Sequence, residues 1–260
     1  MTPATRNGLA AVPTIDPSHA APAAPVTVTP PSSLPTPKRP LSASRVTRAA
    51  LVVGSAVLPW SIRRRLLNRV LGWAIHPNAR IGVSIIDVED LRLGDGAAIG
   101  HANFISRLRK LHMGPGAQIG KMNWIRVATA LSPQGEDEAP GELIMGDASG
   151  MTGQHFVDCS GGLYFGAGSM LGGCRTTIMT HQIDVPARRQ RGHATYIGDR
   201  ALVASNCTIG PGTSLAAESL IAMGSNARGA CVETGVIYAG NPARPHGVFE
   251  APADDYFNFT

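Results

Sequence analysis

The sequence "IGDRALVASNCTIGPGTSLAAESLIAMGSNARGACV", residues 197–232, has an apolar residue at every sixth position. These residues are Ile197, Val203, Ile209, Leu215, Ile221 and Ala227. The position four residues after each of them holds a small residue. A period of six fits neither an α-helix, at 3.6 residues per turn, nor a simple alternating strand. It predicts a short strand and a turn, repeated as the sides of a three-sided coil whose apolar residues point inward.

The same period recurs upstream, so the repeat extends over most of the chain. Two further blocks consist of Leu93, Ile99, Ile105 and Leu111, and of Met145, Met151, Val157 and Leu163. An acidic segment at 128–142 and a basic segment at 182–196 interrupt the pattern. The predicted fold class is therefore all-β, a stack of coils over residues 75–247 in which each coil contacts only its neighbours.

The segments that flank the repeat have other compositions. Residues 1–43 are rich in proline, alanine, threonine and serine, which predicts a disordered tail because such a sequence buries little apolar surface. Residues 44–74 combine apolar residues with arginines and contain no acidic residue, which predicts a basic amphipathic helical segment. Its role is open between a cap on the stack and an interfacial helix on anionic lipid. Residues 248–260 are predicted to form a C-terminal tail.

Composition excludes several classes of function. The 260-residue chain has a formal net charge of +5 and only 5% aromatic residues. Its basic residues gather between residues 38 and 70 and are not interleaved with aromatic residues over the repeat, which argues against nucleic-acid binding. The four cysteines include no C-x-x-C pair, which excludes a zinc ribbon and a thioredoxin-like site.

One histidine has a distinctive position, within "TTIMTHQIDV" at residues 176–185. His181 ends a strand-like apolar run and directly precedes the basic interruption at 182–196. From the residues alone it could be a structural histidine at a coil corner, a metal ligand or a general base. The last role suits a histidine because its ordinary pKa lies near neutral pH.

The hexads and two short motifs together resemble a known family. The segment 197–245, the "THQID" sequence at 180–184 and the "AGNPAR" sequence at 239–244 resemble the hexapeptide-repeat acyltransferases, in particular sugar and polysaccharide O-acetyltransferases. The resemblance covers residues 75–247. It implies a left-handed parallel β-helix, whose handedness rests on the resemblance alone, and a homotrimer with active sites between subunits.

The resemblance implies transfer of an acyl group from acetyl-CoA to a hydroxyl group of a sugar or glycan. His181 matches the catalytic position, where its Nε2 atom would take the hydroxyl proton. The CoA donor would bind Gly224, Ser225, Asn241 and Arg244. The acceptor would contact His155, Asp158 and Asp184. The residues leave other roles open, because His155 could pack at a corner and Asp158 could orient a histidine or cap a turn.

No metal is expected at the site. The γ-class carbonic anhydrases share this type of β-helix and bind zinc through three histidines, two of them five residues apart. None of the eight histidines here has a partner at that spacing, and an open zinc site needs three protein ligands. The expected location is the cytoplasm, with residues 44–74 available for peripheral contact with the inner face of the membrane. The alternative function is a non-catalytic trimeric scaffold at that surface.

Overall fold

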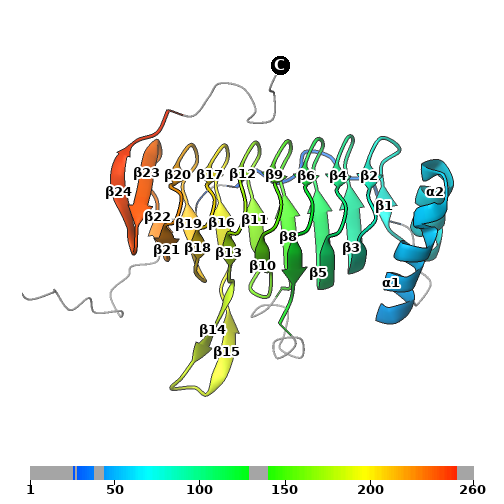
Figure 1. Cartoon of the computed structure of the whole chain (residues 1–260), viewed down its shortest axis with the longest axis horizontal. Coiled ribbons are helices and arrows are strands. Elements are labelled where there is room, and N and C mark those ends of the chain that lie inside the picture. The colour runs from blue at the N-terminus through cyan, green and yellow to red at the C-terminus, as the bar shows by residue number, and fades with distance from the viewer. Residues whose placement is uncertain (1–25, 27, 38–43, 129–139, 251–260) are drawn as a thin grey trace, which may run out of the picture.

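The computed structural model describes residue 26 and residues 28–37, 44–128 and 140–250. In this part of the chain, short strands wind into a stack of three-sided coils along the longest axis of the molecule (Figure 1). Successive coils pair through parallel strands, and the predicted left-handed parallel β-helix is confirmed. The elements of one coil lie directly beside those of the next, so each coil buries its edges against its neighbours.

Each coil has three sides, called faces 1, 2 and 3 in chain order. Face 1 consists of β2 (Arg80–Ile81), β4 (Ala98–Ile99), β6 (Gln118–Ile119), β9 (Gly150–Met151), β12 (Met170–Leu171), β17 (Leu202–Val203), β20 (Leu220–Ile221) and β23 (Val236–Gly240). Face 2 consists of the first halves of β3 (Ile85–Leu93) and β5 (Phe104–Met113), and of β7 (Trp124–Arg126), β10 (Phe156–Asp158), β13 (Thr177–Ile178), β18 (Thr208–Ile209) and β21 (Asn226–Ala227). Face 3 consists of β1 (Ala74–Ile75), the second halves of β3 and β5, and β8 (Glu142–Met145), β11 (Leu163–Phe165), β16 (Thr195–Ile197), β19 (Ser214–Leu215) and β22 (Ala230–Cys231).

The hexad residues form the core. Ile197, Val203 and Ile209 lie on faces 3, 1 and 2, and each is fully buried. Each pairs with the hexad residue one coil later, in the register Ile197–Leu215, Val203–Ile221 and Ile209–Ala227. Three hexads therefore make one coil, and the apolar positions stack along the axis into a continuous interior, as the period predicts.

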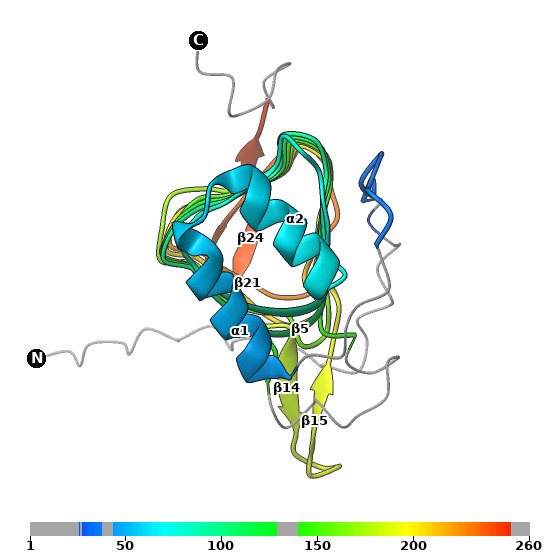
Figure 2. The same ribbon diagram turned by 90° about the vertical axis from the view of Figure 1, so that its right-hand side faces the viewer.

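The N-terminal end of the stack is covered by helices. The helix α1 (Arg45–Gly54), the short 3₁₀ helix η2 (Ser55–Val57) and the helix α2 (Trp60–Val70) lie across this end (Figure 2). Val52 and Leu67 are buried against it. The guanidinium of Arg63 donates to the backbone carbonyls of Ile81 and Gly82, at the open edge of the first coil. Residues 44–74 therefore cap the stack, and no helix of the described chain is long and apolar enough to cross a membrane.

The opposite end is closed by a turn of the chain. The strand β24 (Ala243–Val248) pairs antiparallel with β23, which ends the series of parallel strands. The "AGNPAR" sequence at 239–244 forms the connection between them, with a cis peptide bond between Asn241 and Pro242. Residues 251–260, the greater part of the predicted C-terminal tail, lie outside the described residues.

Part of the proline-rich N-terminal segment lies against the coils. Residues 28–37, called the strap, lie at the corner between faces 3 and 1. The backbone N–H of Thr29 donates to Oδ1 of Asp199 at 2.9 Å, and its hydroxyl donates to Oδ2. The backbone N–H of Ser32 donates to Oδ1 of Asp147 at 2.9 Å. The strap thus differs from the predicted disorder, because carboxylates of two coils satisfy backbone donors that this segment cannot satisfy itself. Residues 1–25, 27 and 38–43 lie outside the described residues.

Candidate active site

The corner between faces 2 and 3 differs from the other two corners, because both interruptions of the hexad pattern fall between a strand of face 2 and a strand of face 3. Residues 129–139 of the acidic interruption lie outside the described residues. The basic interruption, predicted as a loop, forms an antiparallel hairpin of β14 (His181–Asp184) and β15 (Arg189–Gly192). The hairpin projects from the stack (Figure 1). His181 is its first residue and pairs with Gly192, so the histidine lies where the hairpin joins the coil.

His181 contacts a carboxylate from the preceding coil. Its Nδ1 atom lies 2.8 Å from Oδ2 of Asp158, at the end of β10. The side chain of Asp158 is 1% exposed and that of His181 is 14% exposed. An ionised carboxylate only accepts hydrogen bonds, so Nδ1 donates to Asp158 and Nε2 is the ring nitrogen left for a substrate. This is the geometry of a general base that is oriented by a carboxylate.

Other donors hold Asp158 in its ionised form. The hydroxyl of Ser160 donates to Oδ1 at 2.6 Å, and the backbone N–H of Thr180 donates to Oδ2 at 3.1 Å. Burial opposes ionisation of Asp158, but hydrogen bonds from His181, Ser160 and Thr180 outweigh it and lower the pKa of this carboxyl below its ordinary value. The negative charge of Asp158 can therefore stabilise an imidazolium on His181.

The structure corrects the predicted contact between Asp158 and the acceptor. The carboxylate is buried, and both of its oxygens are bonded to groups of its own chain. Of the roles that the sequence left open for Asp158, the geometry supports the orientation of a histidine. We describe Asp158 as a positioning residue, because it acts through His181.

His155 is also corrected, because it lies at the corner between faces 1 and 2 and is 2% exposed. Its Nε2 lies 3.0 Å from Oγ1 of Thr152, and its Nδ1 accepts the backbone N–H of Thr176 at 3.2 Å. Its backbone N–H continues a ladder of side-chain hydrogen bonds from Asn103 and Asn123 in the two preceding coils. Burial lowers the pKa of His155 to about 4, so the ring is neutral at physiological pH. The predicted acceptor contact gives way to a structural role.

Asp184 likewise has a structural role in this structure. Its Oδ1 accepts the backbone N–H of Ala187 at 3.0 Å, and its Oδ2 forms an ion pair with Nε of Arg191 at 3.0 Å. These contacts stabilise the turn at the far end of the hairpin. The carboxylate thus holds β14 and β15 together, and the acceptor contact of Asp184 stays a prediction.

Ser225 and Asn241, two of the residues predicted to bind CoA, both take part in hydrogen bonds at the last coil. The hydroxyl of Ser225 accepts the backbone N–H of Gly240 at 3.1 Å, and Oδ1 of Asn241 accepts Nδ2 of Asn226 at 3.1 Å. These bonds fasten the "AGNPAR" turn to the corner between faces 1 and 2. The strand β21 lies two coils beyond β13, so this turn is about 10 Å further along the axis than His181.

The other two residues predicted to bind CoA, Gly224 and Arg244, flank that turn. Gly224 has a φ of +74°, and a Cβ atom built on it would meet no atom within 4 Å. Asn206, at the matching position one coil earlier, adopts a φ of 58° with a full side chain. The backbone angle alone therefore does not demand glycine at 224, and the open space leaves the backbone accessible to a ligand. Arg244 is exposed on β24, and its Nη1 donates to the carbonyl of Ala243 at 3.2 Å.

Sequence reasoning missed a polar cluster beside the hairpin. The guanidinium of Arg228 donates to Oε1 of Gln182, and Nε2 of Gln182 lies 3.2 Å from Nε2 of His193. The backbone N–H of His193 donates to the carbonyl of Thr180 at 2.7 Å, so the cluster adjoins the His181–Asp158 pair. One signal was present, because every other hexad of residues 197–232 has glycine or alanine at the position that Arg228 occupies.

A groove of the stack lies at a different corner from His181. A groove of about 550 Å³ runs along the corner between faces 1 and 2, and its lining includes His101, Lys121 and Gln154. None of the residues that line it belongs to the His181–Asp158 pair. Among the described residues, no group of three or more His, Cys, Asp or Glu side chains could hold a metal ion.

Comparison with known proteins finds likeness in structure only. No protein-family model matches the chain, and no curated protein matches it. The chain is similar to hexapeptide-repeat acetyltransferases. One is an acetyltransferase from Vibrio cholerae, with 15% identity and a TM-score of 0.35 over 79% of this chain and 90% of that chain. A maltose O-acetyltransferase from Clostridium difficile has 12% identity and a TM-score of 0.34 over 78% and 83% of the two chains.

A third solved structure is the N-acyltransferase AntD from Bacillus cereus, in complex with dTDP and coenzyme A. It has 11% identity and a TM-score of 0.37, over 69% of this chain and 82% of that chain. At these identities and TM-scores the similarity concerns the repeat architecture. The assignment of function rests on the site itself.

Proposed function

We propose that the protein is an acyl-CoA-dependent O-acyltransferase that transfers an acetyl group from CoA to a hydroxyl of a sugar or glycan. The observation that carries the proposal is the 2.8 Å contact between Nδ1 of His181 and Oδ2 of Asp158, at the corner where the hairpin leaves the stack. The sequence resemblance of residues 75–247 to sugar and polysaccharide O-acetyltransferases supports the choice of donor and acceptor.

The proposed reaction uses His181 twice. Its Nε2 takes the proton from the acceptor hydroxyl as that oxygen attacks the thioester carbonyl carbon. The tetrahedral intermediate then collapses with cleavage of the C–S bond, and the departing sulfur takes the proton from Nε2. Asp158 remains ionised throughout and stabilises the imidazolium that exists between the two transfers. A general base of this kind contributes about 10²–10⁴-fold to the rate.

The donor is proposed to lie along the later coils, where Gly224, Ser225, Asn241 and Arg244 are found. The open space beside Gly224 supports close approach of the pantetheine chain to the backbone. The exposed guanidinium of Arg244 is a suitable partner for a CoA phosphate, because it offers several donors in a fixed plane. The donor end that carries the thioester would then extend along the stack towards His181.

The proposed assembly is a homotrimer in the cytoplasm, with the His181 site at a boundary between subunits. Its support is the position of the site on the outside of one stack, beside a projecting hairpin and away from the groove at the corner between faces 1 and 2. A neighbouring subunit would supply the second wall that a binding cleft needs. Light scattering should then give three times the chain mass of 27.1 kDa.

The test is thiol release from acetyl-CoA with a panel of sugar acceptors, compared between the natural protein and His181→Ala. We expect a loss of about 10²–10⁴-fold in kcat for His181→Ala. The control is His246→Ala, which removes an exposed histidine on β24 and should leave the rate unchanged. Equal turnover by the natural protein and His181→Ala would contradict the assigned role. Amino-sugar acceptors in the same panel distinguish O-acylation from N-acylation.

The alternative is the non-catalytic scaffold at the membrane surface. A ligand that binds the folded chain raises its melting temperature with increasing concentration. A rise of Tm with CoA supports the enzyme. An unchanged Tm up to millimolar CoA, together with no thiol release, would favour the scaffold.

A further inference from the structure

The N-terminal cap has one side that packs on the stack and one side that does not. On the packed side of α1, Arg45 and Arg48 form ion pairs with Asp87 at 2.7 and 2.9 Å, and Val52 is fully buried. The other side carries the valine stripe, which consists of Val46, Val53 and Val57, exposed by 79%, 43% and 87%. The spacing of seven and four residues places these side chains on one side of the helix and its 3₁₀ extension.

The second helix adds an apolar residue and positive charge to the cap. Ile62 is 51% exposed, and Arg65 and Arg69 are exposed at three and seven residues beyond it, on the same side of α2. In contrast, Arg63 and Arg64 donate to backbone carbonyls of the first coil. Both helices lie against the end of the stack (Figures 1 and 2), and the side chains that they leave exposed lie on the sides away from the buried Val52 and Leu67.

The chemistry of this surface fits one kind of partner. Single exposed apolar residues are ordinary on a soluble protein, but aliphatic residues along a helix, flanked by arginines and with no acidic residue in 44–74, form an amphipathic membrane-surface pattern. A second copy of the cap is a poor partner, because Arg65 and Arg69 would face the same charges of the other copy. An anionic bilayer offers both an apolar interior for the aliphatic side chains and negative headgroups for the arginines.

We propose that the α1–η2–α2 cap docks on the surface of an anionic lipid bilayer. Val46, Val53, Val57 and Ile62 enter the boundary between headgroups and acyl chains. Arg65 and Arg69 contact lipid phosphates. The docking is independent of the proposed catalytic function, since the cap lies at the end of the stack and shares no residue with the His181 site.

Docking by the cap has a geometric consequence for the site. The strand β13, which precedes His181, is four pairings from β3 along face 2, in the order β3, β5, β7, β10 and β13. At about 4.8 Å per pairing, His181 lies about 20 Å along the axis from the first coil. The site therefore stays in water, at a fixed height above the lipid.

The experiment is co-sedimentation of the full chain with large vesicles of phosphatidylcholine containing about one third phosphatidylglycerol. We expect binding that weakens as salt is added and that is largely lost on pure phosphatidylcholine vesicles. The double variant Arg65→Gln/Arg69→Gln should bind about 30-fold more weakly, from about fivefold per arginine near an anionic surface. The variant Val57→Asp should abolish binding, because it places a charge at the most exposed apolar position.

Two matched controls keep the result specific. Val248→Asp alters a valine of similar exposure, 78%, at the opposite end of the stack, and Arg175→Gln alters an exposed arginine on a coil corner. Both should bind vesicles as the natural protein does. Each variant is also examined for unfolding and for mass in solution. Absence of natural-protein binding to the anionic vesicles, or equal binding by Val57→Asp and Val248→Asp, would overturn the proposal. So would a loss of self-association specific to Val57→Asp, which would assign the surface to a second copy.

Discussion

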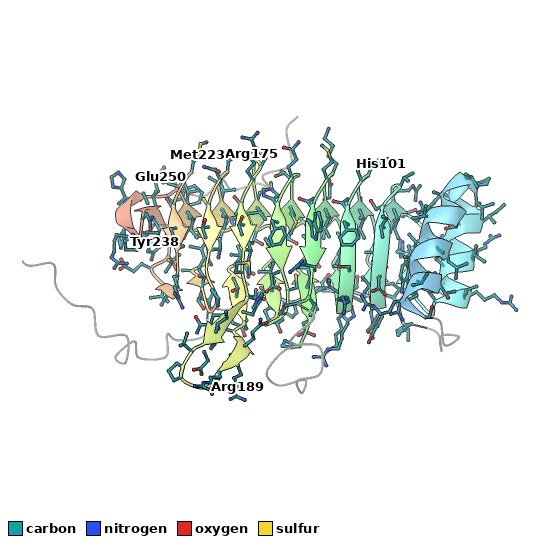
Figure 3. All side chains as sticks on the ribbon, turned by 60° about the horizontal axis from the view of Figure 1, so that its bottom comes forward. His101, Arg175, Arg189, Met223, Tyr238 and Glu250 are labelled. Carbon is teal, nitrogen blue, oxygen red and sulfur yellow. The ribbon has the colours of Figure 1, made fainter. Side chains whose placement is uncertain are left out.

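Two histidines from neighbouring coils, His155 and His181, have opposite surroundings. His155 lies at the corner between faces 1 and 2, where it is 2% exposed and bonded to a hydroxyl and a backbone N–H. His181 lies at the corner between faces 2 and 3, 2.8 Å from an ionised carboxylate and partly open to solvent. The comparison shows that a histidine at a strand end becomes a candidate base through its partner and its open ring nitrogen. Figure 3 shows Arg189 on the hairpin that begins at His181, at the opposite edge of the stack from Arg175.

The largest expected effect comes from removing the charge of Asp158 while keeping its shape. In Asp158→Asn, the amide can present a donor to Nδ1, which favours the ring tautomer with the proton on Nε2. We expect kcat to fall by up to about 10²–10⁴-fold, the whole contribution of His181, because Asp158 acts only through that histidine. Steady-state kinetics measure this, with Asp95→Asn as the control of equal chemistry at an exposed aspartate of the first coils. A small effect on kcat would remove Asp158 from the mechanism.

A loss of stability on mutation should show that His155 has a structural role. His155→Ala leaves the N–H of Thr176 without its partner and opens a cavity, so we expect a loss of about 2–4 kcal/mol in the free energy of unfolding. His155→Asn should recover part of it, because Asn103 and Asn123 occupy the preceding steps of the ladder. Urea unfolding measures both. A stable His155→Ala protein with a raised KM for the acceptor would restore the original prediction of acceptor contact.

The pH dependence of stability should also separate the two corners. The pKa of His155 is lowered from 6.5 to about 4 by burial, so between these values the unfolded chain binds more protons than the folded chain. Stability contributed by neutral His155 is then present above pH 6.5 and is lost as the pH falls towards 4, by about 3 kcal/mol in total. The Asp158 contribution is lost only at lower pH, because the pKa of that carboxyl is lowered from 3.8.

The measurement is the free energy of unfolding from urea titrations at several pH values between 7 and 4. The natural protein should lose about 3 kcal/mol more over this range than His155→Asn does. Identical pH profiles for the two proteins would mean that His155 is not buried in a neutral form.

The smallest expected effect concerns the cluster beside the hairpin. Arg228→Ala removes an exposed side chain that reaches Gln182, and we expect a change of no more than about fivefold in KM for acetyl-CoA, with kcat within about twofold. Arg175→Ala, at an exposed corner away from the hairpin, is the control. A large fall in kcat would show that the cluster holds the hairpin in its catalytic position.

The sequence was sufficient for the fold but not for the site. The hexads from Ile197 to Ala227 predict the three faces, because the apolar residue that recurs at every sixth position is also the residue that the coil buries. The partner of His181 was harder to find, since Asp158 lies 23 residues earlier, whereas three hexads would give 18. Part of the difference arises on face 3, where this coil holds two inward residues, Leu163 and Phe165 on β11. When coils differ in length, the hexad period does not show which residues of neighbouring coils lie side by side. That alignment is seen only in the folded stack.

The ladder and the strap show other limits of sequence reasoning. Asn103, Asn123 and His155 take corresponding places at one corner, but their different side chains give no repeating signal. The strap has the composition of a disordered segment, and its order depends on Asp147 and Asp199 far along the chain. In both cases the hydrogen-bond partner, and not the local composition, determines the structure.

The strap also has a consequence for the order of folding during synthesis. Thr29 is translated 170 residues before Asp199, and Ser32 is translated 115 residues before Asp147. The coils between them can form one after another as the chain emerges, since each needs only its neighbour. The strap, although made before any coil, has no binding surface until the middle of the stack is complete. It is therefore among the first described segments to leave the ribosome and among the last to dock.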